Sequence, residues 1–350
     1  MVDPWSFGNE DIKESYLHVG EESEKHIAYL EATTDQYMVA LSDIERRCYK
    51  PGEDPDRIMQ DLTTLNESML QVCEQFEVVV RNKAALSAAR VAFRDKTDSI
   101  LSKAYGAKRV RTWPQGYQGD YKTIEFIYRN TPLSEGIGYY LDKYLLSATL
   151  AVGVRERMQM LAELLKAEIT RKHSPSILDI ACGSCRELHE IVPEIIKSEA
   201  HFTCIDLDSE ALDFALNRLS YAGLSSERVE FMQYNALRLF DFETALSAFG
   251  MRDIIYSVGY FDYLTDDFLT KMLNALYLIL NPGGKLIAAF KDANRYRSQA
   301  YHWFADWDGF LQRTPDDFDK ILRRAGIASD AVSMSRVKSG SIIFYVATKP

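Results

Sequence analysis

The chain has 350 residues, of which 47% are hydrophobic, and its 51 acidic and 41 basic side chains give a formal net charge of −10. This length exceeds the roughly 100–200 residues of one ordinary domain, so more than one folded part is expected. The acidic balance argues against a DNA or RNA partner, because phosphate contacts need a basic surface.

The sequence contains no obvious targeting segment. No run of about 18 or more residues is continuously apolar, and the first residues lack the charged start and apolar core of a secretory signal. We therefore expect a cytoplasmic protein without membrane association. The five cysteines are odd in number and lie mostly in apolar runs, as reduced core thiols do.

The first hundred residues are predicted to form amphipathic helices. Apolar residues recur at spacings near three and four through residues 10–50 and 55–102, with charged residues between them and almost no glycine. The proline- and glycine-containing segment 51–55 separates the two runs. Residues 1–104 are predicted to be an N-terminal helical bundle, either a packing or homodimerisation layer or a cap over a ligand site.

An aromatic-rich stretch follows the bundle. Residues 109–132 combine aromatic residues, glycines, prolines and arginines too densely for a solvated linker, and the aromatic run continues to Arg155 and Arg157. Residues 105–170 are predicted to be a lid with its connecting helices. Three arginines of the stretch are candidates to bind a carboxylate substrate: Arg109, Arg111 and Arg129.

The most informative segment is 176–188, an apolar run that breaks at Gly183 and continues as a helix. Open α/β sheets bind ligands at the carboxyl ends of their strands, and a glycine there lets the backbone approach the ligand. Asp179 and Glu187 offer carboxylates on either side. A loop with one glycine, no lysine and flanking acids is unsuited to phosphate, which favours an adenosyl cofactor.

Further strand-like runs follow at the intervals of a repeating sheet. They are residues 201–206, 229–236, 253–259, 285–290 after a turn at 281–284, 332–337 and 341–347, which with the first run predict seven strands. Asp206 ends the second strand with a carboxylate that can accept both ribose hydroxyls. Asn235 ends the third with a polar side chain suited to the adenine edge.

This series of motifs over residues 175–350 resembles the class I S-adenosylmethionine-dependent methyltransferases. The resemblance implies an α/β fold with a Rossmann-like seven-stranded sheet over residues 171–350, and S-adenosyl-L-methionine as the cofactor. The family's glycine loop falls on Asp179, Ala181 and Gly183, its ribose-binding acid on Asp206, and its adenine-side motif on Asn235 and Ala236, where the family usually has an acid in place of Asn235. Three more residues complete the expected cofactor-binding set: Tyr121, Leu207 and Ser257.

Cys182 and Cys185 form a C-x-x-C motif, which in other contexts marks a redox or zinc site. No second pair is present to complete a tetrahedral metal site, and Gly183 between the two cysteines belongs to the cofactor loop. We therefore expect no metal.

Residues 116–121 and 128–130 carry a more specific resemblance. A Gly-Tyr-x-Gly-Asp-Tyr segment followed by Tyr-Arg-Asn is similar to the bacterial methyltransferases named for biosynthesis of 3-hydroxypalmitic acid methyl ester, over roughly residues 105–350. The sequence departs from that pattern at residues 113–115. The resemblance implies a bacterial enzyme with a small-molecule substrate, and carboxyl O-methylation is the label of that family.

Two reactions fit these motifs. Methyl transfer from a sulfonium is an in-line displacement that requires alignment and exclusion of water. A carboxylate acceptor needs no base, whereas an amine or hydroxyl would need one, with His189, His302 and Asp262 as candidates. Similar lidded proteins of natural-product biosynthesis are azetidine-2-carboxylate synthases, in which the α-amine of S-adenosylmethionine attacks its own γ-carbon and methylthioadenosine leaves.

The motifs do not separate transfer from cyclisation, and transfer is favoured on prevalence. The candidate catalytic residues are the same for both: Tyr128, Asn130, Tyr139, Ser257 and Tyr260. A non-enzymatic cofactor sensor is disfavoured, because Asp179, Gly183 and Asp206 are all present.

Overall fold

The computed structural model describes residues 21–350, so the predicted helical residues 10–20 lie outside the described part. The chain divides into two compact units. The helical unit contains residues 21–119, 130–147 and 297–308, and the sheet unit contains 120–129, 148–296 and 309–350. The predicted lid, 105–170, is therefore shared between the two units.

The helical unit is built from α2 (Glu21–Arg47), α3 (Pro55–Val79), α4 (Lys83–Leu101), α5 (Tyr105–Thr112) and α7 (Ile137–Ser147). The run 55–102 is thus two helices, α3 and α4. The chain is extended at Val80 and Asn82, and the Asn82 side chain caps α4 by accepting hydrogen bonds from the backbone N–H groups of Ala84 and Ala85.

The core of the helical unit is completed by a segment far along the chain. Trp303, which is 0% exposed, packs edge-on against Phe76 of α3 and Phe93 of α4, with ring centroids 5.7 Å apart in both pairs. Residues 297–308 therefore belong to this unit, although the sequence around them gives no helical-bundle pattern.

Glu77 accepts the hydrogen bonds of a partly buried network in the helical unit. Its carboxylate accepts hydrogen bonds from Arg90 Nη2 at 2.7 Å, Gln299 Nε2 at 2.8 Å and Trp303 Nε1 at 2.8 Å. Burial alone would raise the pKa of Glu77. Hydrogen bonds from His302, Arg90, Gln299 and Trp303 outweigh burial and lower that pKa to about 2.

We expect the Glu77→Gln variant to unfold at a lower temperature than the unmodified protein at pH 7. Ionised Glu77 stabilises the fold above its unfolded pKa of about 4.3, and this contribution is lost as the pH falls from there towards 2. Circular dichroism melts of both proteins between pH 7 and pH 2.5 measure the difference. A difference in melting temperature that stays constant across this range would contradict the assignment.

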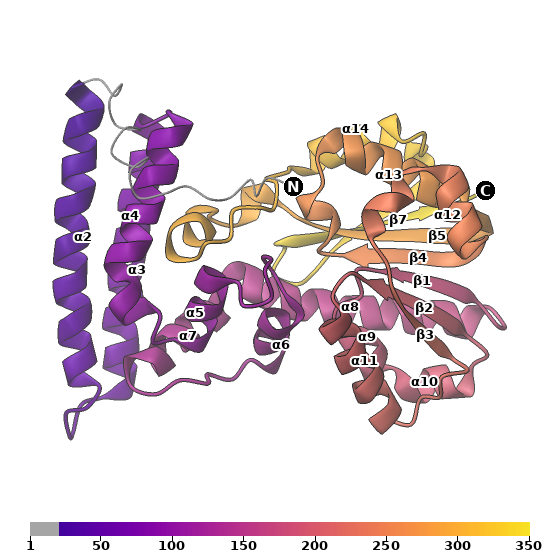
Figure 1. Ribbon diagram of the computed structural model, residues 1–350, viewed down its shortest axis with the longest axis horizontal. Helices are drawn as coiled ribbons and strands as arrows, with labels where there is room; N and C mark the ends of the chain where they lie inside the picture. The colour runs from indigo at the N-terminus through magenta and orange to yellow at the C-terminus, as the bar shows by residue number, and fades with distance from the viewer. Residues whose placement is uncertain (1–20) are drawn as a thin grey trace. The chain divides into compact units, whose positions relative to one another are not determined.

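The sheet unit contains a seven-stranded sheet in the order β3-β2-β1-β4-β5-β7-β6, in which β7 runs in the direction opposite to that of the other six strands (Figure 1). The strands are β1 (Ser176–Ile180), β2 (His201–Asp206), β3 (Val229–Gln233), β4 (Arg252–Val258), β5 (Leu280–Lys291), β6 (Val332–Arg336) and β7 (Ile342–Thr348). This confirms the predicted α/β fold.

One local prediction is wrong, because residues 281–284 lie inside β5 instead of forming a turn before it. Leu280 already pairs with Arg252 of β4, and the register shifts before Lys285 pairs with Ile254. Gly283 takes a φ of +75°, which glycine adopts without strain, and its N–H bonds to the carbonyl of Lys349. The extra residues therefore form a bulge.

Helices cover both faces of the sheet. On one face lie α8 (Thr149–Arg171), α9 (Arg186–Glu190), α10 (Val192–Lys197) and α11 (Ser209–Tyr221); on the other lie α12 (Phe242–Phe249), α13 (Asp266–Leu278) and α14 (Pro315–Arg324) (Figure 1). The chain between residues 120 and 130 adds α6 (Tyr121–Arg129).

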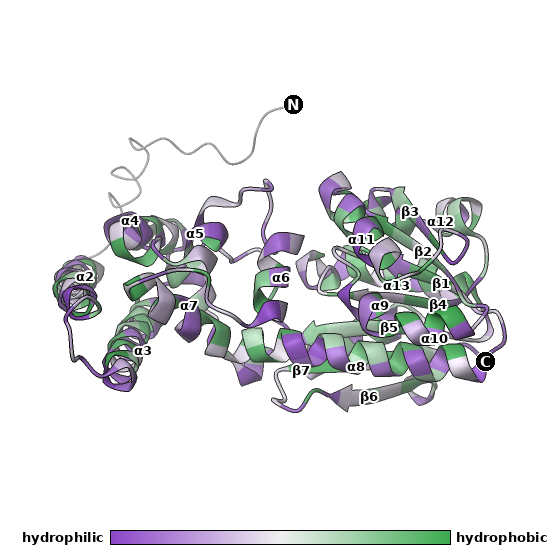
Figure 2. Ribbon diagram, turned by 90° about the horizontal axis from the view of Figure 1, so that it is seen from below, coloured by the Kyte–Doolittle hydropathy of each residue, from purple (hydrophilic) through white to green (hydrophobic). Residues whose placement is uncertain are grey.

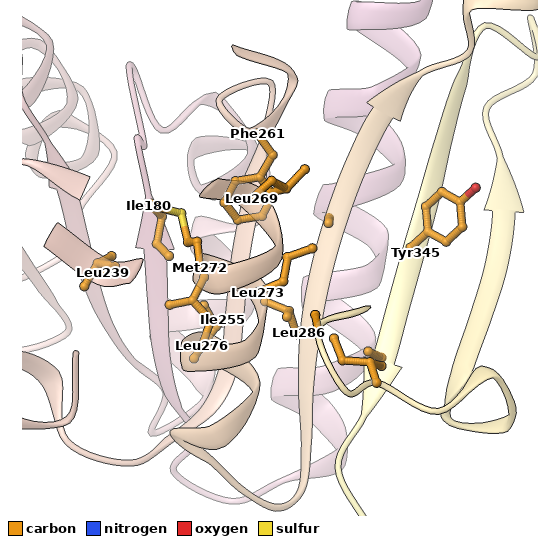
Figure 3. Packing of buried hydrophobic residues seen from close by; sticks show 14 of the residues in the cluster. Ile180, Leu239, Ile255, Phe261, Leu269, Met272, Leu273, Leu276, Leu286 and Tyr345 are labelled. Carbon is orange, nitrogen blue, oxygen red and sulfur yellow. The ribbon is translucent and has the colours of Figure 1, made fainter. Parts of the chain in front are cut away.

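The core between α13 and the sheet follows from residue spacing. Leu269, Met272, Leu273 and Leu276 recur at helical intervals, form one face of α13 and lie against strand residues such as Ile255 (Figure 3). The inner strands are hydrophobic along most of their length, whereas α8 alternates hydrophobic and hydrophilic residues (Figure 2). Between residues 21 and 350, no helix is both long and apolar enough to cross a membrane.

Candidate functional site

The candidate site lies where the strand order reverses, between β1 and β4. In open α/β sheets, ligands bind beyond the carboxyl ends of the strands at this point. The loop after β1, residues 181–185, is called the cofactor loop below. It holds three residues with positive φ, namely Ala181 at 56°, Gly183 at 54° and Cys185 at 47°. A Cβ added at Gly183 would meet only the Cβ of Tyr121, at 4.0 Å, so the need for glycine there is conformational.

Asp206, the predicted ribose-binding acid, is fixed against this loop. Its Oδ2 accepts the N–H of Gly183 at 2.8 Å and its Oδ1 accepts the N–H of Asp208 at 2.9 Å. Burial raises the pKa of Asp206, and these backbone hydrogen bonds oppose the rise. Each carboxylate oxygen keeps a second lone pair, so the side chain can also accept two hydroxyl groups.

Asp179 and Glu187 form a buried acid pair, with exposed fractions of 2% and 6%. The Tyr256 hydroxyl donates to Glu187 Oε1 at 3.1 Å. Burial, followed by the charge of Glu187, holds the pKa of Asp179 well above its usual range, and burial also raises the pKa of Glu187. Such a pair favours a bound proton or a bound cation, and an ammonium group would satisfy it.

Helix α6 is attached to the cofactor loop by a buried ion pair. Glu125 accepts hydrogen bonds from Arg218 Nη1 and Nη2, both at 2.6 Å, and from Ser184 Oγ at 2.7 Å. Arg218 Nη1 also donates to the carbonyl of Ser184 at 3.2 Å. We call these three residues the α6 clamp. Sequence reasoning missed the clamp, and its only signal was an acid within the apolar run 124–128.

The α6 clamp fixes two of the predicted residues. Tyr121 is buried with its ring 5.3 Å from that of Phe214, and Tyr128 is partly buried at the end of α6. Burial raises the pKa of Tyr128, and the nearby Arg157 opposes the rise. Both tyrosines therefore belong to the sheet unit, together with the cofactor loop.

Two predicted residues of β4 and its following loop take different roles. Ser257 is fully buried and donates its hydroxyl proton to the carbonyl of Ile180 at 2.8 Å, which ties β4 to β1. Burial and the charge of Asp206 raise the pKa of Tyr260 to about 12, so this phenol is neutral and lies within electrostatic reach of Asp206.

The adenine-side residues follow β3. The Oδ1 of Asn235 accepts the N–H of Leu237 at 3.0 Å and so caps the short helix that Ala236 begins. A purine edge that faces Asn235 would therefore meet its Nδ2 donor. Leu207 is 63% exposed beside Asp206, and its carbonyl accepts a hydrogen bond from Gln233.

Asn130 and Tyr139 belong to the helical unit, unlike the candidate catalytic residues Tyr128, Ser257 and Tyr260. Both are exposed, and Tyr139 packs edge-on against Tyr140 with ring centroids 5.2 Å apart. Arg111 is also in this unit, where it donates to the carbonyls of Phe304 and Arg94. The guanidinium of Arg111 is thus engaged in the packing of its own unit.

The candidate bases are mostly engaged elsewhere. Asp262 is 2% exposed and forms an ion pair with Lys291. His302 lies in the helical unit, with Nδ1 3.0 Å from Arg90 Nη2. His189 stays in the sheet unit on α9.

Three buried cysteines lie in or near the cofactor loop, Cys182 and Cys185 within it and Cys204 on β2. Burial raises the pKa of the thiols of Cys182, Cys185 and Cys204 well above the usual range, so all three are neutral. A carboxylate oxygen of Asp179 and the Sγ atoms of Cys182 and Cys185 all lie within 4.8 Å of one another. Neutral thiols of this kind behave as small core residues.

Comparisons with known proteins agree with this geometry. Residues 177–284 match the family model described as a methyltransferase domain. No curated protein matches the chain. A possible exported protein from Bordetella parapertussis is similar in structure over 92% of this chain and 97% of its own, with 15% identity and a TM-score of 0.54. At this identity the likeness concerns the fold alone.

Two further solved structures cover little more than half of this chain. Magnesium protoporphyrin IX methyltransferase from Synechocystis PCC 6803, solved with bound SAM, matches over 58% of this chain and 82% of its own, with 15% identity and a TM-score of 0.42. The N-methyltransferase NodS from Bradyrhizobium japonicum WM9 matches over 56% of this chain and 96% of its own, with 16% identity and a TM-score of 0.39.

Proposed function

We propose that this protein, whose sheet unit has a class I methyltransferase fold, is an S-adenosylmethionine-dependent methyltransferase that transfers the methyl group to a small carboxylic acid or natural-product intermediate. The observation that carries the proposal is the fixed position of Asp206 on the glycine loop, with hydrogen bonds to Gly183 and Asp208. In this proposal the Asp206 carboxylate faces the ribose, and the backbone at Gly183, which has no side chain, lies close to the remainder of the cofactor.

The side chains of the sheet unit suit an acceptor that needs no base. When bound, S-adenosylmethionine supplies an electrophilic methyl group on a sulfonium. Asp262 is held in its ion pair with Lys291, and Tyr260 is a neutral phenol that carries no charge with which to take up a proton. A carboxylate acceptor is already ionised at neutral pH. The rings of Tyr128 and Tyr260 are proposed to face the sulfonium through their π surfaces.

The 3-hydroxy fatty acids form the substrate class suggested by the resemblance of residues 116–121 and 128–130. In this proposal Tyr128 and Tyr260 orient the acceptor and exclude water. Asn130 and Tyr139, which belong to the helical unit, remain candidate catalytic residues in this proposal.

The buried acid pair supports a second candidate function, the cyclisation of S-adenosylmethionine to azetidine-2-carboxylate. That reaction needs an unprotonated α-amine, and a carboxylate with a raised pKa is a better proton acceptor than an ordinary one. Asp179 and Glu187 have raised pKa values because they are buried together. In this second proposal they take the proton of the α-ammonium group.

The leaving group distinguishes the two reactions. With S-adenosylmethionine as the only substrate, we expect the purified protein to leave it largely intact. S-adenosylhomocysteine should form only after an acid such as 3-hydroxypalmitate is added, because transfer needs an acceptor. Liquid chromatography with mass spectrometry follows both products over time.

The opposite result has an equally clear signature. Methylthioadenosine above the spontaneous background, formed without any acceptor and lost in the Tyr128→Ala variant, would refute transfer and establish cyclisation. A heat-inactivated sample provides the background rate.

A further inference from the structure

Arg157, on α8, is a buried cation that forms no ion pair within the described part of the chain. It is 5% exposed, and among residues 21–350 it forms no ion pair within 4.0 Å, while its Nε has no hydrogen-bond partner. The other buried arginine of the sheet unit, Arg313, is 4% exposed and binds Asp266 and the carbonyls of Phe261 and Leu264. Arg313 therefore has the partners that Arg157 lacks.

The guanidinium of Arg157 lies at the reversal point of the strand order. A Cβ added at Gly259 would be 3.0 Å from Arg157 Nη1 and 3.5 Å from Nη2, so the guanidinium rests on the backbone directly after β4. Gly259 has a φ of +103°, which also requires glycine. The guanidinium thus lies beside the cofactor loop, which follows the neighbouring strand β1.

The groups around Arg157 do not neutralise it. Arg157 lies close enough to lower the pKa of the buried acid Glu187, although burial raises that pKa overall, and the two side chains form no ion pair within 4.0 Å. Tyr128 is a neutral phenol. Lys291 is a second cation near Arg157, whose charge lowers the pKa of Lys291, and it is paired with Asp262. Because a buried charge without a partner is strongly unfavourable, this arrangement calls for an anion that residues 21–350 do not supply.

We propose that Arg157 binds a carboxylate of the ligand through its guanidinium, with Tyr128 beside it. A planar guanidinium matches a carboxylate in geometry and charge. Two carboxylates have access to the site under the proposed function, on which this inference rests. One is the α-carboxylate of S-adenosylmethionine, whose ammonium group would then face Asp179 and Glu187; the other is the carboxylate of an acid acceptor.

The test compares S-adenosylmethionine with decarboxylated S-adenosylmethionine, which lacks only the carboxylate. By calorimetry, we expect the unmodified protein to bind the decarboxylated compound about 10–100-fold more weakly, as expected for loss of a charge-assisted hydrogen bond. The Arg157→Gln variant should bind both compounds equally and weakly. The Arg155→Gln variant, changed two residues away on the same helix, should keep the preference.

A second arm addresses the acceptor. With the cofactor site saturated by S-adenosylhomocysteine, we measure the binding of octanoate and of its neutral amide to the same proteins. A preference for octanoate that disappears in Arg157→Gln, together with an unchanged cofactor preference, assigns Arg157 to the acceptor. Loss of the cofactor preference assigns it to the cofactor.

Two results would overturn the inference. Equal preferences in Arg157→Gln and the unmodified protein, in both arms, would show that Arg157 binds no ligand carboxylate. A ligand-free Arg157→Gln protein that melts well below the unmodified protein would show that the charge serves the fold. If the unmodified protein binds no S-adenosylmethionine at all, the proposed function itself fails, which separates the two failures.

Discussion

Replacing Asp206 with alanine should weaken S-adenosylmethionine binding by about 10–100-fold or more. The carboxylate is proposed to accept both ribose hydroxyls, and charge-assisted hydrogen bonds contribute about 1.5–3 kcal/mol each. The same change removes the acceptor that holds the N–H of Gly183 at 2.8 Å, so the loop loses its fixed position as well. The two losses act in the same direction.

Calorimetry with S-adenosylmethionine measures this effect, and Asp208→Asn is the matched control. Asp208 lies two residues away and caps α11 by accepting the N–H groups of Glu210 and Ala211, a role that asparagine also performs. The control should keep its affinity. Undiminished affinity in Asp206→Ala would refute the assignment of Asp206 to the ribose.

Replacing Arg218 with methionine should reduce both stability and cofactor affinity. The α6 clamp joins α6, the cofactor loop and α11, and the side chains of Glu125 and Arg218 are 5% and 11% exposed. Removal of one partner leaves the other charge buried and unpaired, which costs about 3–5 kcal/mol. Burial alone would raise the pKa of Glu125, and the bonds from Arg218 and Ser184 lower it, so the acid is charged when the pair is intact.

A double-mutant cycle separates the ion pair from its surroundings. The Glu125→Gln, Arg218→Met double variant should regain most of the stability lost in Arg218→Met, because no buried charge remains. Its cofactor affinity should stay low, since Ser184 and α6 are no longer fixed. Urea unfolding and calorimetry provide the two readouts, and unchanged affinity in both variants would mean that the clamp does not position the site.

The order and type of the strands were determined by the sequence itself. The central strands β1 and β4 are short, mainly apolar runs, and β1, β2 and β3 begin at the predicted residues, Ser176, His201 and Val229. Asp206 is the last residue of β2, and Gly183 lies in the loop that follows β1, so the local pattern was sufficient to bring them to the same edge of a parallel sheet. The hydrogen bond between them agrees with that expectation.

Tertiary structure alone decided which distant segments meet. Glu125 and Arg218 are 93 residues apart in the chain, and Glu77 and Trp303 are 226 apart. The predicted lid was one continuous stretch of sequence, yet 120–129 belongs to the sheet unit and 130–147 to the helical unit. Hydrophobic periodicity reports only how a segment is buried, whereas the partner of a buried charge such as Glu125 depends on how complete elements pack.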